Sequence, residues 1–346
     1  MTMTEMNKAD AEHGNSREGT VLVLGATGSF AGAVAAELLN RGQPVRVLVR
    51  NKDKLINRFG QPRGLEIIEG DVQNMEDLAA ASAGCKTIVH GVNYPYHQWF
   101  PHMETATRNI LVAARSNNAL IVFPGNVYSL GHAGPQPFTE TATHNPVSRK
   151  GELRQWMEEE LAAFARDGGR VLNMRAGDYF GPTARNGYLD PLFGGAAKGK
   201  AMLALGNLSL SHQWAYVPDL ARATVDLMAK SEDLSPYEVV HFEGTITKSQ
   251  REFMSDIARV AGCRDKVLRL PWVLLRLVAL FSPLIREVME MKYLYESTVL
   301  IKGPRFHALL PDFVATPTDQ AIAETIKSYR VENTPVAAHN PVNQAG

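Results

Sequence analysis

The chain has 346 residues, and its 36 Lys and Arg side chains balance 36 Asp and Glu side chains, so the formal net charge is zero with neutral His. Hydrophobic residues make up 45% of the chain, which is typical of globular proteins and excludes a largely disordered one. The balanced charge offers no basic excess for phosphates, so we do not expect a nucleic-acid partner. Two cysteines, Cys85 and Cys263, exclude a disulfide scaffold, and histidines without metal-ligand spacing predict no metal site.

Both ends of the chain are polar. Residues 1–18 lack the apolar core of a signal peptide, and residues 331–346 are rich in Asn, Pro and Ala, so we expect a disordered leader and a disordered tail. The most apolar stretch, residues 268–285, is interrupted by two prolines and by Arg276 and is too short to span a bilayer. We expect a buried or partner-facing helix here, with an interfacial membrane helix as the alternative, and a cytoplasmic protein without membrane contact.

Strands and helices alternate over the first half of the chain. Short apolar runs predict strands at residues 20–25, 44–50, 65–71, 87–92, 120–123 and 171–174. Helical patterns lie between them at residues 33–42, 75–83, 105–117 and 152–166. This alternation predicts an α/β fold with a doubly wound parallel sheet that helices cover on both faces.

The pattern weakens from about residue 181. Residues 194–206 are rich in Gly and Ala and are expected to form a loop. Two helices, at residues 219–230 and 249–261, and a late strand at residues 239–242 are expected beyond it. We therefore expect the C-terminal half to add a smaller cap that contributes to a cleft.

A glycine-rich turn, GATGSFAG at residues 25–32, follows the first expected strand and opens a helix. Glycines allow the tight turn and a close backbone approach, and the helix N-terminus presents free N–H groups to a pyrophosphate. Gly25, Thr27, Gly28, Ser29 and Phe30 are therefore predicted to bind a dinucleotide. A tight turn without a ligand is the alternative.

Four segments taken together resemble a known family: residues 25–32, GDV at 70–72, GNVYSLG at 125–131 and RAGDYFGP at 175–182. Their order and spacing are similar to those of the extended and atypical short-chain dehydrogenases/reductases, the NAD-dependent epimerase/dehydratase group. The resemblance spans about residues 20–327. It implies a Rossmann-type dinucleotide-binding domain over residues 19–180 and a mixed substrate-cap region over residues 181–330, some segments of which return to the Rossmann core.

The resemblance also implies roles for single residues. Asp71 would face the adenine, Val72 would contact its ring, and Gly91 would pass beside the cofactor. Residues 175–182 would close over the nicotinamide end. For Asp71 the alternative is a helix cap or a turn residue.

The end of the second strand bears on which dinucleotide is bound. An NAD-preferring site usually has Asp or Glu there, to accept from the ribose 2′-OH, but this chain has Val49 and Arg50. The guanidinium of Arg50 suits a 2′-phosphate, and Lys52 or Lys54 would add positive charge. We therefore favour NADP(H) over NAD(H). A solvated Arg50 is the alternative, and Asp53 would oppose a 2′-phosphate.

The family's usual active site, a Ser or Thr, a Tyr, and a Lys four residues after the Tyr, is not matched. The hydroxyl position holds Pro124, and no Tyr occurs between Tyr128 and Tyr179. Family members often carry an acid four residues after the Lys, and aligning Glu158 with that acid places Lys150 at the Tyr position and Arg154 at the Lys position.

Lys150, Tyr128 and Arg154 are the predicted catalytic residues, and Lys150 is also predicted to contact the cofactor. Arg154 can hold a ribose or a phosphate, whereas Lys150 would act as acid or base only with a lowered pKa. The alternatives are a basic helix start, an Arg154–Glu158 ion pair and a core role for Tyr128. Asn126, Asp178 and Tyr179 are further polar candidates near the cleft, and the aromatic cluster at residues 94–100 would line the pocket or pack under the next helix.

Two function classes follow from these patterns. One is an NADP(H)-dependent oxidoreductase, epimerase or dehydratase that acts on a small carbonyl or sugar-like substrate with a non-standard active site. The other is a catalytically inactive NADP(H)-binding sensor or regulator, which the missing Tyr favours. Family members commonly dimerise through two helices, so a homodimer through residues 105–117 and 152–166 is a further hypothesis.

Overall fold

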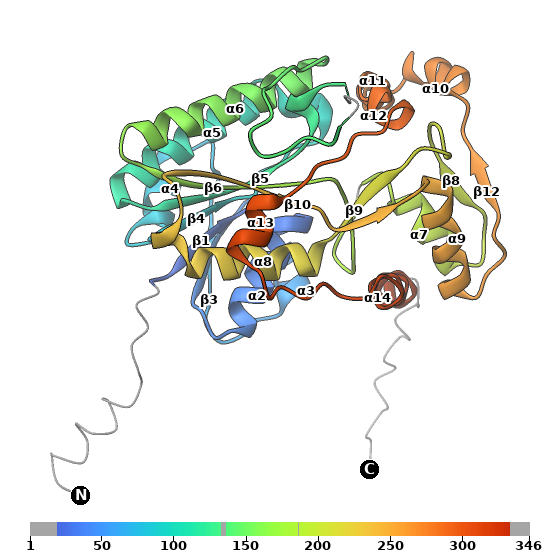
Figure 1. Ribbon diagram of the computed structural model, residues 1–346. Helices are drawn as coiled ribbons and strands as arrows, with labels where there is room; N and C mark the ends of the chain where they lie inside the picture. The colour runs from blue at the N-terminus through green and yellow to red at the C-terminus, as the bar shows by residue number, and fades with distance from the viewer. Residues whose placement is uncertain (1–18, 133–135, 186, 333–346) are drawn as a thin grey trace, which may run out of the picture.

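The structure is a computed structural model that describes residues 19–132, 136–185 and 187–332. The ends predicted to be disordered lie outside the described residues, apart from Val331 and Glu332, which belong to a helix. Figure 1 shows the central sheet with helices on both sides and a second lobe beside it.

Seven parallel strands form the central sheet. In spatial order they are β10 (Tyr237–Phe242), β6 (Arg170–Ala176), β5 (Leu120–Gly125), β4 (Thr87–His90), β1 (Val21–Leu24), β2 (Val45–Val49) and β3 (Leu65–Glu69). The chain order changes direction between β1 and β4, where Leu24 is paired with His90. This arrangement confirms the predicted Rossmann-type doubly wound sheet, and such a switch point is where open α/β sheets bind ligands.

Helices cover both faces of the sheet, because successive side chains of a strand point to opposite faces and both sets are apolar. In β1, Val21 and Val23 belong to one core cluster and Leu22 and Leu24 to the other, and all four are buried. The first cluster includes α2 (Ser29–Asn40), α3 (Lys52–Phe59) and α8 (Val217–Ala229). The second includes α4 (Met75–Ser82), α5 (Trp99–Asn117) and α6 (Arg149–Arg166). Each face therefore has its own hydrophobic core.

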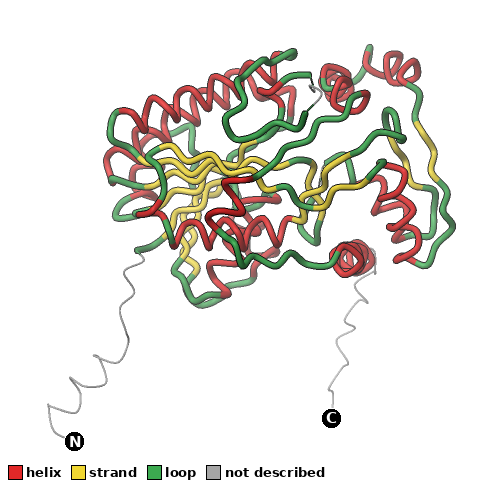
Figure 2. Tube along the Cα trace, viewed as in Figure 1, coloured by secondary structure: helices red, strands yellow, loops and turns green. Residues whose placement is uncertain are grey.

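The second lobe contains a third core and two small sheets. One sheet joins β7 (Asp178–Phe180), β9 (His212–Tyr216) and β11 (Thr245–Thr247), and the other joins β8 (Met202–Ala204) and β12 (Val267–Arg269). The helices that pack there are α7 (Asp190–Ala197), α9 (Gln250–Ala261) and α14 (Thr318–Glu332). Along the chain, α8 and β10 come between elements of the second lobe but belong to the part of the molecule with the central sheet. The chain therefore passes between the two parts more than once (Figure 2).

Two predictions for the second half are wrong. Residues 194–206, expected as a loop, contain the end of α7 and the whole of β8, because Leu192, Phe193 and Ala196 bury one face of the helix in the third core. Residues 268–285 do not form a single helix, and most of their large apolar side chains are exposed, so the buried alternative is wrong and the partner-facing one stays a prediction. They contain the end of β12, then α10 (Trp272–Ala279) and the start of α11 (Pro283–Glu290), which Ser282 caps.

The remaining helices are α12 (Lys292–Glu296) and α13 (Pro304–Leu309), with 3-10 turns at Tyr96–Gln98, Tyr128–Leu130 and Ser231–Asp233. Among the described residues, no helix is both long and apolar enough to cross a bilayer.

Candidate active site

Two adjoining cavities lie at the carboxyl ends of the central strands. The inner cavity, about 300 Å³, lies between the ends of β1, β4 and β5 and the second lobe. The outer cavity, about 400 Å³, lies at the ends of β1, β2 and β3. Val92 and Asn93 line both, so the two join beside β4. Of the ten residues predicted to bind the cofactor, all except Lys150 line one of the two cavities: Gly25, Thr27, Gly28, Ser29, Phe30, Arg50, Asp71, Val72 and Gly91.

The glycine-rich turn leaves the N-terminus of α2 open toward the inner cavity. Gly28 is the N-cap residue, and no side chain of the described chain caps the helix. Gly25 has a φ of +73°, and a Cβ there would lie 2.2 Å from the carbonyl oxygen of Gly91. Free N–H groups at a helix N-terminus, and glycines that let a ligand approach the backbone closely, are what a pyrophosphate requires, so the turn fits a dinucleotide.

Gly91 explains how the turn accommodates an alanine. Ala31 stands where related turns usually carry their third glycine, and a Cβ on Gly91 would lie 2.2 Å from the Cβ of Ala31 and 2.8 Å from the Leu24 carbonyl oxygen. Because Gly91 has no side chain, there is room for the methyl group of Ala31. The close packing of α2 on the sheet is preserved.

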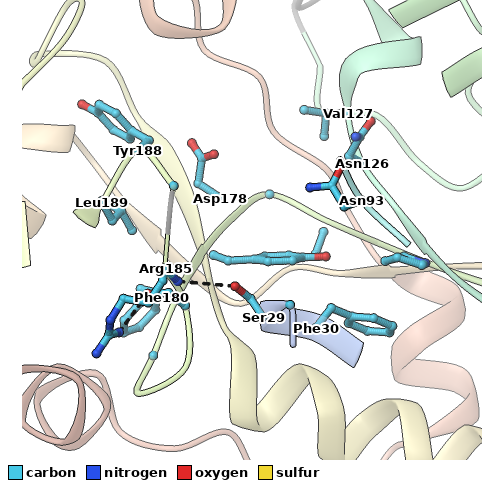
Figure 3. Close-up of a pocket in the computed structure, with 18 of the residues that line it drawn as sticks. Ser29, Phe30, Asn93, Asn126, Val127, Asp178, Phe180, Arg185, Tyr188 and Leu189 are labelled. Atoms are coloured by element: carbon cyan, nitrogen blue, oxygen red, sulfur yellow. Dashed lines mark hydrogen bonds between the residues drawn. The ribbon is translucent and has the colours of Figure 1, made fainter. Parts of the chain in front are cut away.

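Two arginines that sequence reasoning missed flank the turn. Arg58 of α3 donates from Nη1 to the Thr27 carbonyl oxygen over 2.6 Å, while its buried Nη2 has no partner among the described residues. The backbone N–H of Arg185 donates to Ser29 Oγ over 3.4 Å, as the dashed line in Figure 3 marks. Burial and then the nearby Arg185 charge lower the pKa of Arg58. An anion held by the turn would offset this repulsion.

The outer cavity collects the residues predicted to select the dinucleotide. Arg50 and Lys54 line it, with the Arg50 guanidinium 5.6 Å from the ring centre of Tyr94. Lys52 and Asp53 do not line it. Asp71 lines the cavity and also accepts the Gln73 N–H over 3.0 Å, so it combines a turn role with a place in the cavity wall.

Lys150 lines neither cavity, but its ammonium lies 5.2 Å from the ring centre of Tyr96, which lines the inner cavity. Its side chain is fully buried, and its ammonium contacts the carboxylates of Glu287 and Glu290 on α11. Its backbone N–H donates to Glu290 Oε1 over 3.1 Å, and Ser148 caps α6 just before it. Lys150 therefore lies behind Tyr96, and the structure does not place it in the cavity wall that Tyr128 and Arg154 share.

Arg154 lines the inner cavity, but its guanidinium is held by its surroundings. It lies 4.5 Å from the ring centre of Phe123 and donates to the Pro124 carbonyl oxygen. The alternative that Arg154 pairs with Glu158 is wrong, because the Glu158 carboxylate binds Arg175 and His144.

Glu158 is almost completely buried in this network. Burial alone would raise the pKa of Glu158, but Arg175 and then His144 outweigh that effect and lower it. The carboxylate is therefore charged at neutral pH, and it binds the Arg175 guanidinium and the His144 ring behind the cavity.

Two tyrosines on the β5 side share a hydrogen bond at the inner cavity. The Tyr128 hydroxyl lies 2.8 Å from the Tyr96 hydroxyl, and both residues line the cavity. Burial raises the pKa of both phenols, and burial raises the pKa of the neighbouring Tyr179 to about 12. At neutral pH the pair is protonated, so it can donate a proton or a hydrogen bond to a substrate oxygen.

The second lobe contributes an acid and a histidine to the opposite wall. His212 Nε2 lies 2.8 Å from Asp178 Oδ2, and the centre of the His212 ring lies 4.1 Å from that of Trp214, with the two rings tilted by 37°. His212 Nδ1 is buried without a partner among the described residues. Figure 3 shows Asp178 and Tyr188 across the cavity from Asn93 and Asn126. Asp178 was a candidate from the sequence, but His212 was not, because no pattern marked β9.

No group of His, Cys, Asp or Glu in the described part of the chain is arranged to hold a metal ion. The tyrosine pair on one wall and Asp178 and His212 on the other can offer hydrogen bonds and proton transfer to a bound molecule.

Comparisons with known proteins agree with this architecture. A UDP-N-acetyl-alpha-D-glucosaminuronate decarboxylase from Bacillus cytotoxicus is 24% identical over 277 residues, which cover 72% of this chain and 83% of that protein. Among solved structures, a dTDP-glucose 4,6-dehydratase from Bacillus anthracis in complex with NAD superposes with a TM-score of 0.74 at 15% identity, over 91% of this chain and 97% of that one. A UDP-glucose 4-epimerase from Thermotoga maritima with UDP-glucose also gives 0.74, at 15% identity, over 90% and 99% of the two chains.

At these identities the solved structures establish the shared fold. The sequence itself matches the NAD dependent epimerase/dehydratase family over residues 21–241. This protein therefore belongs to the NAD dependent epimerase/dehydratase family, as the resemblance in its motifs predicts.

Proposed function

We propose that this protein is an oxidoreductase that binds a nicotinamide dinucleotide, NADP(H) in preference to NAD(H), and acts on a small carbonyl or sugar-like substrate. The observation that carries the proposal is the Tyr96–Tyr128 hydroxyl pair in the cavity that the open N-terminus of α2 also lines. A proton source thus lies in the same cavity as the residues that suit a pyrophosphate.

The preference for NADP(H) rests on the outer cavity. Arg50 and Lys54 line it, and β2 ends in Val49 rather than in an acid. A 2′-phosphate would accept charge-assisted hydrogen bonds from Arg50, whereas an unphosphorylated ribose would find no carboxylate at the end of β2. Related structures were solved with NAD, which is a reason to measure both dinucleotides.

The bound dinucleotide would supply or accept a hydride at the carbon of the substrate. In the reducing direction Tyr128 gives its hydroxyl proton to the substrate oxygen, and Tyr96 donates a hydrogen bond to the phenolate that remains. Solvent then returns a proton to Tyr128. Asp178 and His212 would orient a substrate hydroxyl from the opposite wall.

A second candidate function is an NADP(H)-binding sensor without catalysis. The observation that favours it is the ion cluster of Lys150 with Glu287 and Glu290, because it engages the residue at the position of the family's Tyr. Pro124 in place of a hydroxyl residue adds to this argument. In that case the dinucleotide would stabilise one conformation of the protein, and no substrate would be turned over.

Calorimetric titration of NADPH and NADH tests the dinucleotide site. We expect Arg50→Ala to weaken NADPH binding by roughly ten- to a hundredfold, as for the loss of a charge-assisted hydrogen bond, with little effect on NADH. Lys198→Ala is the matched control, because Lys198 is exposed and lines neither cavity. No binding of either dinucleotide would refute both candidate functions.

NADPH oxidation with a panel of aldehydes, ketones and keto-sugars then separates the two functions. The oxidoreductase predicts turnover that Tyr128→Phe reduces by roughly a hundredfold, because only the proton-donating hydroxyl is removed. NADPH binding without turnover of any carbonyl compound favours the sensor.

We further propose a cytoplasmic location and a homodimer through α5 and α6. Most of the large apolar side chains of α5 and α6 are in the core of the chain, among them Ile110, Met157 and Leu161. Phe100 and Val112 are the large apolar residues of α5 that remain exposed. A monomeric mass in light scattering would refute the dimer.

A further inference from the structure

An apolar surface covers the helical hairpin of α10 and α11. Residues 268–284 carry eight of the fifteen large apolar side chains that are exposed in the described part of the chain. Phe281, in the turn of the hairpin, is 89% exposed. The eight residues are Leu268, Val273, Leu274, Leu277, Val278, Leu280, Phe281 and Leu284. Contiguous exposed apolar surface of this kind marks an interaction site rather than ordinary surface.

The same segment is strongly cationic. Between residues 264 and 286 five Lys and Arg side chains are exposed, and none of them forms an ion pair within the described chain. Asp265 is the single acid of this stretch, and it is paired with Arg251 over 2.6 Å. The five cations are Arg264, Lys266, Arg269, Arg276 and Arg286. In a chain whose formal net charge is zero, this segment is a local positive patch.

From the juxtaposition of this apolar hairpin with its flanking cations, we infer that α10 and α11 dock on the surface of a bilayer that contains anionic phospholipid. The apolar turn enters the boundary between headgroups and acyl chains, and the cations bind the phosphates around it. The occupant follows from charge, because a second copy of the chain would bring the same five cations against one another. A lipid surface supplies the opposite charge and an apolar layer together.

Contacts with α6 and the chain connection to α12 link the hairpin to the rest of the protein. Glu287 and Glu290 of α11 hold the buried Lys150 of α6. The next helix, α12, contributes Leu294 and Tyr295 to the wall of the inner cavity. Figure 1 shows α10, α11 and α12 together at one edge of the molecule. Docking would therefore hold this wall of the cavity at the membrane surface, whatever reaction or ligand the cavity serves.

Vesicle flotation of the full chain tests the inference. We expect the protein to float with vesicles of equal parts phosphatidylcholine and phosphatidylglycerol, and to bind vesicles of phosphatidylcholine alone at least about tenfold more weakly. Binding to the anionic vesicles should fall as salt is raised. Failure to float with anionic vesicles, or equal binding to both kinds, overturns the inference.

Two variants test the two parts of the surface. Leu277→Ser with Phe281→Ser should lower the partition coefficient by at least about tenfold, because both side chains would enter the acyl boundary. Arg276→Gln with Arg286→Gln should give roughly a tenfold loss on the anionic vesicles only. These side chains are exposed, so the fold is retained, and circular dichroism checks this.

Val314→Ser is the matched control, because Val314 is 76% exposed and lies outside the hairpin; its binding should be unchanged. A double serine variant that binds as well as the unchanged protein overturns the inference. A concentration-dependent dimer that the same variant abolishes, together with no flotation, would assign the surface to a second copy and also overturn it.

Discussion

Replacing Lys150 by Met tests whether this residue acts in the ion cluster or at the dinucleotide. Its ammonium is fully buried, whereas the side chains of Glu287 and Glu290 are 26% and 23% exposed. Removing one partner of a buried ion pair typically destabilises a protein by about 3–5 kcal/mol. Because both carboxylates keep some solvent, we expect about 3 kcal/mol here, measured by urea unfolding at neutral pH. NADPH binding should change by less than about twofold, since Lys150 lines neither cavity.

Two comparisons make this prediction refutable. Lys198→Met removes an exposed ammonium and should change the free energy of unfolding by less than about 0.5 kcal/mol. Lys150→Met combined with Glu287→Gln and Glu290→Gln removes the carboxylate repulsion and should recover most of the loss. If Lys150→Met is as mild as the control, the ion cluster does not form in solution. If it abolishes NADPH binding in a folded protein, Lys150 serves the cofactor after all.

Three further predictions concern the turn, the core and the pyrophosphate. Gly91→Ala should destabilise the fold by about 2 kcal/mol in thermal unfolding, because the new Cβ overpacks the site. Adding Ala31→Gly should recover part of this loss, because the 2.2 Å contact with the Ala31 Cβ disappears while the contact with the Leu24 carbonyl oxygen remains. Equal losses in the single and the double variant would contradict this explanation. Burial and then the Arg154 charge lower the pKa of His90 to about 3 in the folded protein. As the pH falls, the unfolded chain therefore takes up this proton before the folded protein does. The free energy of unfolding should decrease between about pH 6.5 and pH 3, by up to about 1.4 kcal/mol per pH unit. In His90→Asn the free energy of unfolding should depend less steeply on pH across this range than in the unchanged protein. His307→Asn, which replaces an exposed histidine, should keep the original pH dependence. The same pH dependence in all three proteins would refute the prediction. Arg58→Met should weaken NADPH and NADH equally, by about tenfold in calorimetry, because it acts beside the pyrophosphate turn; a selective loss of NADPH would place it at the 2′-phosphate instead.

The central sheet and the phosphate turn follow from local chemistry. The apolar run of β1, the glycines after it and the Ala- and Leu-rich helix that follows each favour their own conformation, so residues 21–40 were predicted from neighbours in sequence. The carboxyl ends of parallel strands lie at one edge, which is why Arg50 and Asp71 were expected near the turn and line a cavity with Gly25. Predictions of this kind need only the order of the elements.

The second wall of the cavity depends on contacts that no local pattern records. His212 reaches Asp178 across 34 residues of chain, and the carboxylates around Lys150 come from 137 and 140 residues away. The short strands of the second lobe, such as β8 and β9, are stabilised by packing in the third core rather than by their own propensity. Arg58 was missed for a related reason, since α3 has eight residues and buries only Leu55.

The departures from the family's active-site pattern are consistent with one another in three dimensions. A lysine at the start of α6 is stable in a buried position only with counter-charges, and α11 supplies two. An arginine four residues later spans to the Pro124 carbonyl oxygen, so the residue that replaces a hydroxyl still serves as an acceptor through its backbone. Both basic side chains are thereby engaged in structural contacts. Under the proposed function, proton donation falls to the Tyr96–Tyr128 pair, which lies in the same cavity as the open helix N-terminus. The proposal thus predicts relocated acid chemistry, and Tyr128→Phe is the substitution that decides between relocation and loss.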